Sequence, residues 1–149
     1  MNIFKKIIEK IYLSFKDNLV IVDALTGVFN KNFILYDKHI EKYQGYVTLV
    51  DLNSFKEIND KYGHQYGDQV LIAAANTLKN YGLVIRYGGD EFIVLSKEPI
   101  GIIGDLYSVG CVFKTKYDSF NETLELADDK MYQFKQNYYR NTGRNRRRV

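Results

Sequence analysis

Acidic side chains at the ends of two apolar runs are the residues of this 149-residue chain best suited to chemistry. Asp90 and Glu91 follow two glycines inside VIRYGGDEFIVL, residues 84–95, and Asp51 ends the apolar run GYVTLVD, residues 45–51. A glycine pair favours a tight hairpin turn, so the first two acids are predicted at the tip of a rigid hairpin. Carboxylates that converge from adjacent strands suit Mg²⁺, which phosphates and water then complete. The predicted chemistry is metal-assisted phosphoryl transfer.

The same acids have a structural interpretation, which stays open at this point. Gly-Gly-Asp is a common turn sequence, and Asp51 would also serve as a cap for the helix that follows it. Neither feature alone distinguishes a metal site from a turn.

Hydrophobic periodicity predicts the elements that position the acids. The predicted strands are 45–51, 84–87, 91–96 and 106–113, and the predicted helices are 30–43, 55–62, 68–80 and a long C-terminal helix marked by Leu124, Ala127, Met131, Phe134 and Tyr138. A strand, two helices, a hairpin, a strand and a helix in this order predict an α+β, ferredoxin-related sandwich. Its central sheet should be mainly antiparallel, with the flanking helices largely on one face.

Composition indicates one folded domain, with 46% hydrophobic and 26% charged residues. The single cysteine, Cys111, cannot form an internal disulfide, which fits a reducing cytoplasm. No apolar run approaches the roughly 20 residues that span a bilayer, so we expect no transmembrane segment.

The two ends of the chain differ from the rest. Residues 1–22 are predicted as an amphipathic helix over 1–17 and a connector, ahead of a main domain over 23–149. The apolar positions of this helix are Ile3, Phe4, Ile7, Ile8, Ile11, Tyr12 and Phe15. Packing on its own domain is the simplest interpretation; a dimer contact or a membrane-surface contact is the alternative. Five arginines give a basic C-terminal tail, which is expected to be solvated, with a phosphate or nucleic-acid contact as the alternative.

Four stretches together resemble the GGDEF family of diguanylate cyclases, in the family's order. They are DALTGVFNKNF at 23–33, DLNSFKEINDKYGHQYGDQVL at 51–71, RYGGDEF at 86–92 and ADDKMYQFK at 127–135. The resemblance implies a palm-like nucleotidyl cyclase domain that condenses two GTP into cyclic di-GMP and two pyrophosphates. It also implies a Mg²⁺ cofactor, with Mn²⁺ as an alternative, and a homodimer, with no nucleic acid as partner.

The resemblance also implies a role for individual residues. Asp51 and Asp90 would bind the metal with the carbonyl of Leu52, and Glu91 would assist deprotonation of the attacking 3′-hydroxyl. The substrate-binding residues would be Phe55, Lys56, Asn59, His64, Asp68, Lys135 and Arg140. Of these, Asn59 and Asp68 match the pair that reads guanine, His64 the position beside the base, and Lys56 and Lys135 the triphosphate lysines.

Four departures from the family pattern stand out. Asn53 replaces a second aspartate, and only residues 96–105 lie where the family has a helix, so one family helix is predicted to be missing. The RxxD product-inhibition motif is replaced by residues 79–82, KNYG. The closing Gly-Arg-Asn comes five residues late, at 143–145, which leaves the phosphate arginine open between Arg140 and Arg144.

Two other functions remain as alternatives. A minimal palm synthase of the CRISPR-polymerase kind would make a different cyclic dinucleotide, although Asn59 and Asp68 favour guanine. A non-catalytic GTP-binding module would have lost activity with the missing helix, although Asp51, Asp90 and Glu91 are intact.

Overall fold

The computed structural model describes residue 8 and residues 21–143. The helix expected over 1–17 therefore lies outside the described residues except for Ile8, as does the arginine tail from residue 144 onward. The described elements are β1 (Phe29–Asn30), α2 (Asn32–Tyr36), the 3₁₀ turn η1 (Ile40–Lys42), β2 (Gly45–Leu52), α3 (Phe55–Tyr62), α4 (His64–Leu78), β3 (Leu83–Arg86), β4 (Glu91–Ser96), β5 (Tyr107–Lys114) and α5 (Phe120–Asn141).

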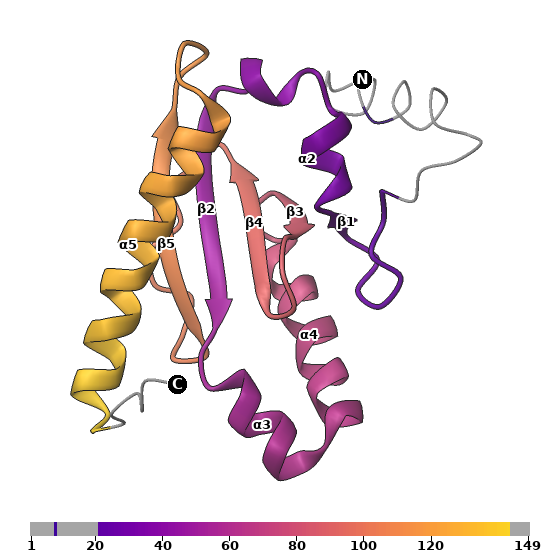
Figure 1. Ribbon diagram of the computed structural model, residues 1–149, viewed down its shortest axis with the longest axis vertical. Helices are drawn as coiled ribbons and strands as arrows, with labels where there is room; N and C mark the ends of the chain where they lie inside the picture. The colour runs from indigo at the N-terminus through magenta and orange to yellow at the C-terminus, as the bar shows by residue number, and fades with distance from the viewer. Residues whose placement is uncertain (1–7, 9–20, 144–149) are drawn as a thin grey trace.

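One five-stranded sheet organises the domain, in the order β1-β3-β4-β2-β5 (Figure 1). β2 runs antiparallel to both β4 and β5, and β3 is antiparallel to β4. The short β1 is parallel to β3. The prediction of an α+β fold with a mainly antiparallel sheet is confirmed.

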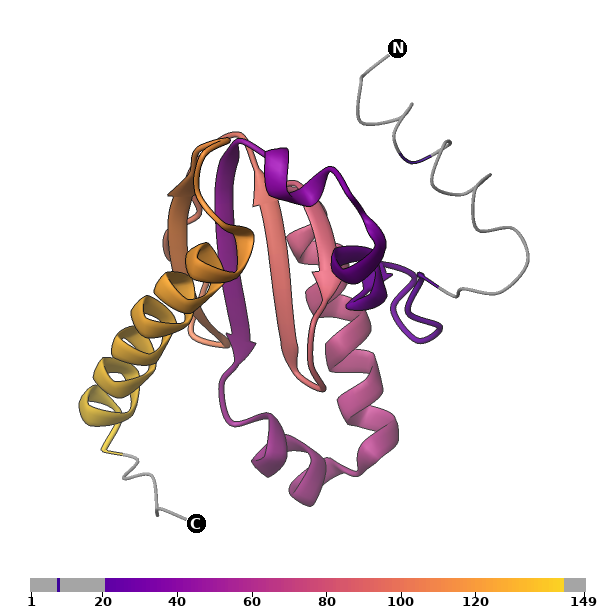
Figure 2. The same cartoon turned by 45° about the horizontal axis from the view of Figure 1, so that its top comes forward.

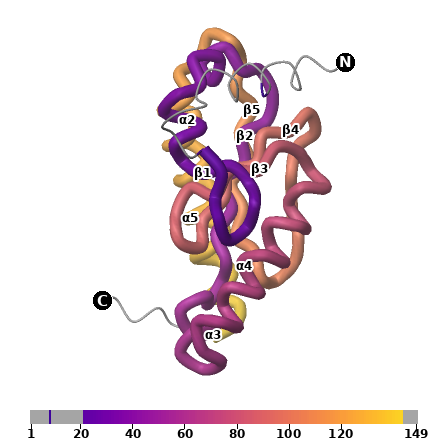
Figure 3. The backbone as a smooth tube through the Cα atoms, turned by 90° about the vertical axis from the view of Figure 1, so that its right-hand side faces the viewer, coloured from indigo at the N-terminus to yellow at the C-terminus, as the bar shows by residue number. Residues whose placement is uncertain are grey.

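Helices cover both faces of this sheet, so the expectation that they lie largely on one face is wrong. Val47 and Leu49 of β2 belong to a core cluster with Phe33 of α2 and Met131 of α5. Val50 and Leu52 of the same strand, two of the residues that point the other way, belong to a second cluster with Leu71 and other α4 residues. Apolar side chains on both faces of the central strands thus require two covering layers. The backbone tube in Figure 3 shows α4 and α5 on opposite sides of the strands.

α5 lies close against β5 and β2 because β5 carries a glycine at the crossing. A Cβ on Gly110 would overlap the carbonyl oxygen of Ala127, so any larger residue would push the helix away. Ser119 caps this helix by accepting a hydrogen bond from the backbone N–H of Glu122 at 3.4 Å. The close approach sets the depth at which α5 side chains reach the sheet.

Two predicted helices have different bounds in the structure. The helix expected over 30–43 is divided into α2 and η1, because the Asp37 backbone is extended and its carboxylate accepts the His39 N–H at 2.9 Å. α4 begins at His64 rather than Asp68, directly after Gly63, whose positive φ of 86° ends α3.

The connection between β4 and β5 contains no helix, as the sequence predicted. α3 lies beyond the carboxyl end of β2 and joins α4, as Figures 1 and 2 show. In the described part of the chain, no helix is long and apolar enough to cross a membrane.

Candidate active site

Asp51 and Glu91 are directly opposite one another in the register of β2 and β4. Cβ atoms of such pairs are about 4.5–5.5 Å apart, so the two carboxylates share one face of the sheet. Asp90 precedes Glu91 in the turn, and its carbonyl accepts the Leu52 N–H at 3.1 Å. The structure thus brings Asp51 and Glu91 together from two adjacent strands and places Asp90 next to Glu91 in the turn.

The glycines of the turn have separate reasons to be there. A Cβ on Gly88 would come within 2.5 Å of Glu91 Oε2, so a larger residue would displace that carboxylate. The carbonyl of Gly89 accepts hydrogen bonds from Arg86 Nη2 at 2.7 Å and Nε at 3.3 Å. The turn is thus fixed by the arginine that precedes it.

Arg86 also joins the turn to the segment that enters the domain. Its Nη1 lies 3.2 Å from both carboxylate oxygens of Asp23. Oδ2 of that carboxylate also accepts the N–H and the hydroxyl of Thr26. Burial opposes ionisation of Asp23, but the bonds from Thr26 and Arg86 outweigh it, and the pKa of Asp23 is lowered. The segment at Asp23 is therefore connected to the acidic turn through Arg86.

Lys135 of α5 reaches the acids from the covering helix and forms a buried ion pair with Asp51. Burial raises the pKa of Glu91, and the charges of Asp51, Asp90 and Asp128 raise it further, whereas Lys135 lowers it. The site therefore concentrates negative charge around one ammonium group.

Asp128 is a member of this acidic set that sequence reasoning missed. The signal was available, because Asp128 and Lys135 are seven residues apart on one helix and so lie on the same side of it. Its neighbours only become identifiable once the crossing of α5 over the sheet is known.

The amide at Asn53 does not point to a metal site. Its Nδ2 donates to the carbonyl of Asp105 at 2.9 Å, and its Oδ1 accepts the hydroxyl of Ser108 at 2.5 Å. The Asn53 N–H donates to the Leu106 carbonyl at 2.7 Å. Asn53 thus fastens the turn after β2 to the short β4–β5 connection, and an aspartate could not donate the first of these bonds.

α3 and α4 bring together most of the residues expected to bind substrate. Asn59 Oδ1 is buried without a hydrogen-bond partner among the described residues. It lies against Gly67, where a Cβ would overlap it, and Phe55 packs at the same crossing. Asp68 is the next residue, half-buried on α4. An unpaired acceptor buried at this helix crossing suits a ligand that carries an N–H donor.

The remaining expected contacts lie at the edge of this region. Lys56 and His64 are exposed on α3 and at the start of α4. Arg140 is exposed in the last turn of α5 and forms no ion pair with a described residue. The neighbouring Tyr139 accepts the Ser54 N–H at 3.3 Å, which joins α5 to the turn between β2 and α3.

That turn has a strained backbone. Ser54 has φ of 57° and precedes the first turn of α3, and it is the one non-glycine residue with positive φ in the described chain. Such strain is concentrated at functional positions.

The oxygen donors present fit a hard divalent cation. Asp51, Asp90 and Glu91 offer carboxylates, and no group of three acid, histidine or cysteine side chains in residues 8 and 21–143 forms a ready metal site. Mg²⁺ is commonly held by one or two carboxylates together with substrate phosphates and water, so two of these carboxylates are a sufficient protein share for this metal.

Comparisons with known proteins point to one family. The family described as "Diguanylate cyclase, GGDEF domain" matches residues 20–100. Diguanylate cyclase DgcM of Escherichia coli K12 is 31% identical over 156 residues, covering 83% of this chain and 37% of the relative. Diguanylate cyclase DgcZ of the same strain is 38% identical over 95 residues, covering 59% and 32%. The chain thus spans about a third of the length of these curated relatives.

A solved structure shows the same fold. The GGDEF domain of TpbB (YfiN) from Pseudomonas aeruginosa superposes with a TM-score of 0.61 at 28% identity, covering 78% of this chain and 89% of that one.

Proposed function

The chain belongs to the GGDEF domain family, and we propose that it is a diguanylate cyclase, which condenses two GTP into cyclic di-GMP and two pyrophosphates. The observation that carries the proposal is the pairing of Asp51 with Glu91 at the hairpin turn, with Lys135 beside them. The activity follows from this site and from the family together. A GTP-consuming enzyme with one cysteine, which cannot form an internal disulfide, would act in the cytoplasm.

In the proposed reaction, the 3′-hydroxyl oxygen of one GTP attacks the α-phosphorus of another. A new P–O bond forms, the bond from the α-phosphorus to the bridging oxygen breaks, and pyrophosphate leaves with its electrons. Asp51 and Asp90, with the carbonyl of Leu52, would hold Mg²⁺ or Mn²⁺, which supplies charge stabilisation for the phosphoryl group. Glu91 would accept the hydroxyl proton, and its raised pKa makes it a stronger base once ionised.

Substrate recognition would come from α3, α4 and α5. Asn59 Oδ1 would accept from the guanine amino group, and the Asp68 carboxylate from guanine N1 and N2, with His64 beside the base and Phe55 supporting Asn59 from below. The exposed Lys56 would bind the triphosphate. The oxygen acceptors of Asn59 and Asp68 would bind the N–H donors of guanine, and the Lys56 ammonium would bind the anionic phosphates.

Lys135 would have two positions in the cycle. It pairs with Asp51 in this structure, and it would turn to the triphosphate once a cation compensates the acids. Arg140, on the same helix five residues later, would assist at the phosphates.

One site of this kind holds one GTP, so the second substrate must be presented by another copy. We therefore propose a homodimer as the catalytic form, with two sites facing each other.

The direct test is to incubate the purified chain with each nucleoside triphosphate and Mg²⁺ and to identify products by mass. Cyclic di-GMP from GTP is expected, and its absence with Asp90→Asn would tie it to the site. A different cyclic dinucleotide, or GTP binding without product, would overturn the proposal.

A further inference from the structure

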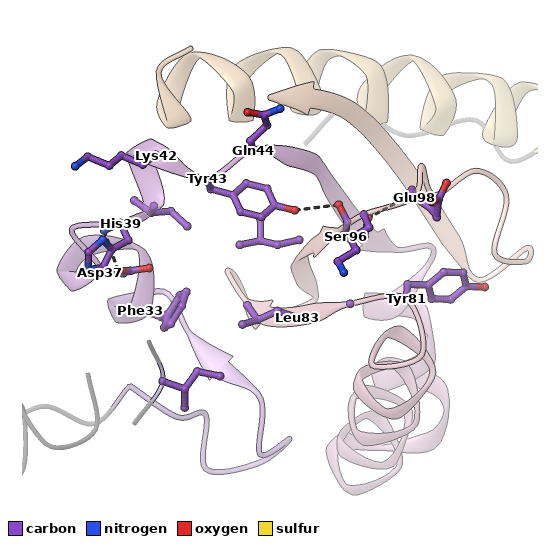
Figure 4. A pocket seen from close by; sticks show the side chains of 15 residues that line it. Phe33, Asp37, His39, Lys42, Tyr43, Gln44, Tyr81, Leu83, Ser96 and Glu98 are labelled. Carbon is purple, nitrogen blue, oxygen red and sulfur yellow. Dashed lines mark hydrogen bonds between the residues drawn. The ribbon is translucent and has the colours of Figure 1, made fainter. Parts of the chain in front are cut away.

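Two adjoining hollows lie at the open end of the β3–β4 hairpin, one of about 760 Å³ and one of about 370 Å³. Gly82 and Leu83 line both, and we call the combined depression the hairpin groove. Figure 4 shows the larger hollow, with Phe33 and Leu83 on one side and Tyr43 across from them. The hairpin groove is a concave surface large enough for several side chains.

This groove is separate from the candidate active site. Leu83 and Leu95, which line it, are register partners at the open end of the hairpin, whereas Asp90 and Glu91 lie at the closed end. Whatever occupies the groove contacts the hairpin without contacting the acids.

The chemistry of the groove suits an apolar occupant. Phe33, Ile40, Leu83 and Leu95 line the larger hollow, and Val28 and Val84 line the smaller one. Tyr43 adds its ring, since its hydroxyl is already bonded to the carbonyl of Ser96 at 3.0 Å. Burial raises the pKa of Tyr43 to about 12, so the hydroxyl stays neutral. The lining of the hairpin groove is therefore mainly apolar.

We propose that the N-terminal segment, residues 1–17, docks in the hairpin groove through its apolar face. Ile8, the described residue of this segment, is half-buried and lines both hollows. The residues at i−4, i+3, i+4 and i+7 from Ile8 are Phe4, Ile11, Tyr12 and Phe15, so an apolar stripe is centred on the observed contact.

The chain also returns to the same place after this segment. Val22 and Phe29 line the smaller hollow together with Ile8. The Asn30 N–H donates to the carbonyl of Ile21 at 2.9 Å, which fixes the point of return beside β1. The described chain therefore resumes beside the same hollow that Ile8 lines.

The docked segment would support the hairpin at one end while Asp23 supports it at the other. Arg86 carries the contact from Asp23 to the Gly89 carbonyl in the acidic turn. The N-terminal region would thus contact both ends of the hairpin that presents Asp90 and Glu91. Binding of residues 1–17 in the groove would therefore stabilise this hairpin.

The first test compares Ile8→Asp with Lys10→Gln in the full chain without nucleotide. Both change the net charge by one negative unit, and Lys10 lies on the opposite side of a helix from Ile8. Ile8→Asp should lower Tm by about 5 °C and make amide exchange at 82–86 and 94–98 several-fold faster, whereas Lys10→Gln should change neither. Equal behaviour of the two variants would overturn the proposal.

A second test does not depend on the stability of Ile8→Asp. In a Cys111→Ser background, Ile8→Cys with Lys97→Cys should be joined within one chain by a flexible bis-maleimide reagent, because both positions line the larger hollow. Lys10→Cys with Lys97→Cys is the matched control and should be joined less, and equal yields would overturn the proposal. A cross-link between two chains, or a loss of dimer mass by light scattering in Ile8→Asp, would show that a second copy fills the groove and would also overturn the proposal.

Discussion

Two ion pairs flank the same acidic turn, and they differ in what surrounds them. The side chains of Lys135–Asp51 are 11% and 8% exposed, and those of Arg86–Asp23 are 17% and 19% exposed. Burial is similar, so the difference between them lies in their neighbours.

The neighbours of Arg86–Asp23 are complementary. Thr26 donates twice to Asp23, and Arg86 donates to Gly89 as well, so the charges are satisfied within the pair's own network. The neighbours of Lys135–Asp51 are acidic, since Glu91 lies opposite Asp51 and the charges of Asp51, Asp90 and Asp128 raise its pKa. The Arg86–Asp23 pair, whose charges are balanced by its neighbours, has a structural role, and we call it the scaffold pair. The Lys135–Asp51 pair lies among excess negative charge, so its surroundings are suited to bind a further cation.

The largest expected effect follows from removing the proposed metal ligands. Asp90→Asn and Asp51→Asn should each reduce cyclic di-GMP formation by orders of magnitude. Asp90→Asn should keep its Tm, because Asp90 forms no ion pair with another described residue. Asp51→Asn should lower Tm, because it leaves the Lys135 ammonium buried without its partner. Product assays and melting curves check both, and near wild-type rates would mean that the acids are structural.

Lys135→Met should separate the two positions of the lysine. Without nucleotide, the variant should bind Mg²⁺ more tightly than wild type, because a competing cation is gone. With Mg²⁺ present, its KM for GTP should rise about 10- to 100-fold, since a charged phosphate contact is lost. Lys130→Met is the matched control, because Lys130 is exposed and bonds only the Cys111 carbonyl among described residues. Unchanged Mg²⁺ affinity in calorimetry would argue against competition at Asp51.

Sequence reasoning found the acids but not the balance between them. Asp51, Asp90 and Glu91 were predicted from glycines and strand ends, which are local signals. The pairing of Lys135 with Asp51 depends on how closely α5 crosses the sheet, which Gly110 sets from a different strand. The stability cost of neutralising Asp51 therefore follows from the structure and not from these local signals.

The same limit explains the fold-level differences. The periodicity of α5 is long and regular, whereas the hairpin is predicted from its glycine pair and α3 from the spacing of Phe55, Ile58 and Tyr62. The break between α2 and η1 arises from one side-chain bond at Asp37, and the two-sided core arises from strand pairing, and neither is visible in a local pattern. Asn53 was recognised as a departure, but its bonds to Asp105 and Ser108 join segments about 50 residues apart.

The scaffold pair should affect stability more than chemistry. Asp23→Asn keeps an acceptor for Thr26 but loses the charge opposite Arg86, which should cost about 1–2 kcal/mol of unfolding free energy at pH 7. Because the folded pKa of Asp23 is lowered, this contribution is present above the ordinary pKa and is lost as pH falls through the folded pKa. The difference in stability between variant and wild type should therefore shrink in acid. A constant difference from pH 7 to pH 3 in denaturant titrations would contradict this origin.

The smallest expected effect is a pH dependence of stability at Glu91 that is opposite in sign to that of Asp23. The pKa of Glu91 is raised by burial and by neighbouring acids, so the folded state favours its protonated form. Its ionisation then costs stability as pH rises from the ordinary glutamate pKa through the folded pKa, and the cost persists at neutral pH. Without Mg²⁺, Glu91→Gln should therefore melt slightly higher than wild type at pH 7, and the gap should close near pH 4. With Mg²⁺ and GTP the gap should reverse, because the ligand stabilises only the chain that keeps its full acid set. If Glu91→Gln melts lower than wild type at pH 7 without metal, then the acids around Lys135–Asp51 also stabilise the fold. The contrast between the two ion pairs would then fail.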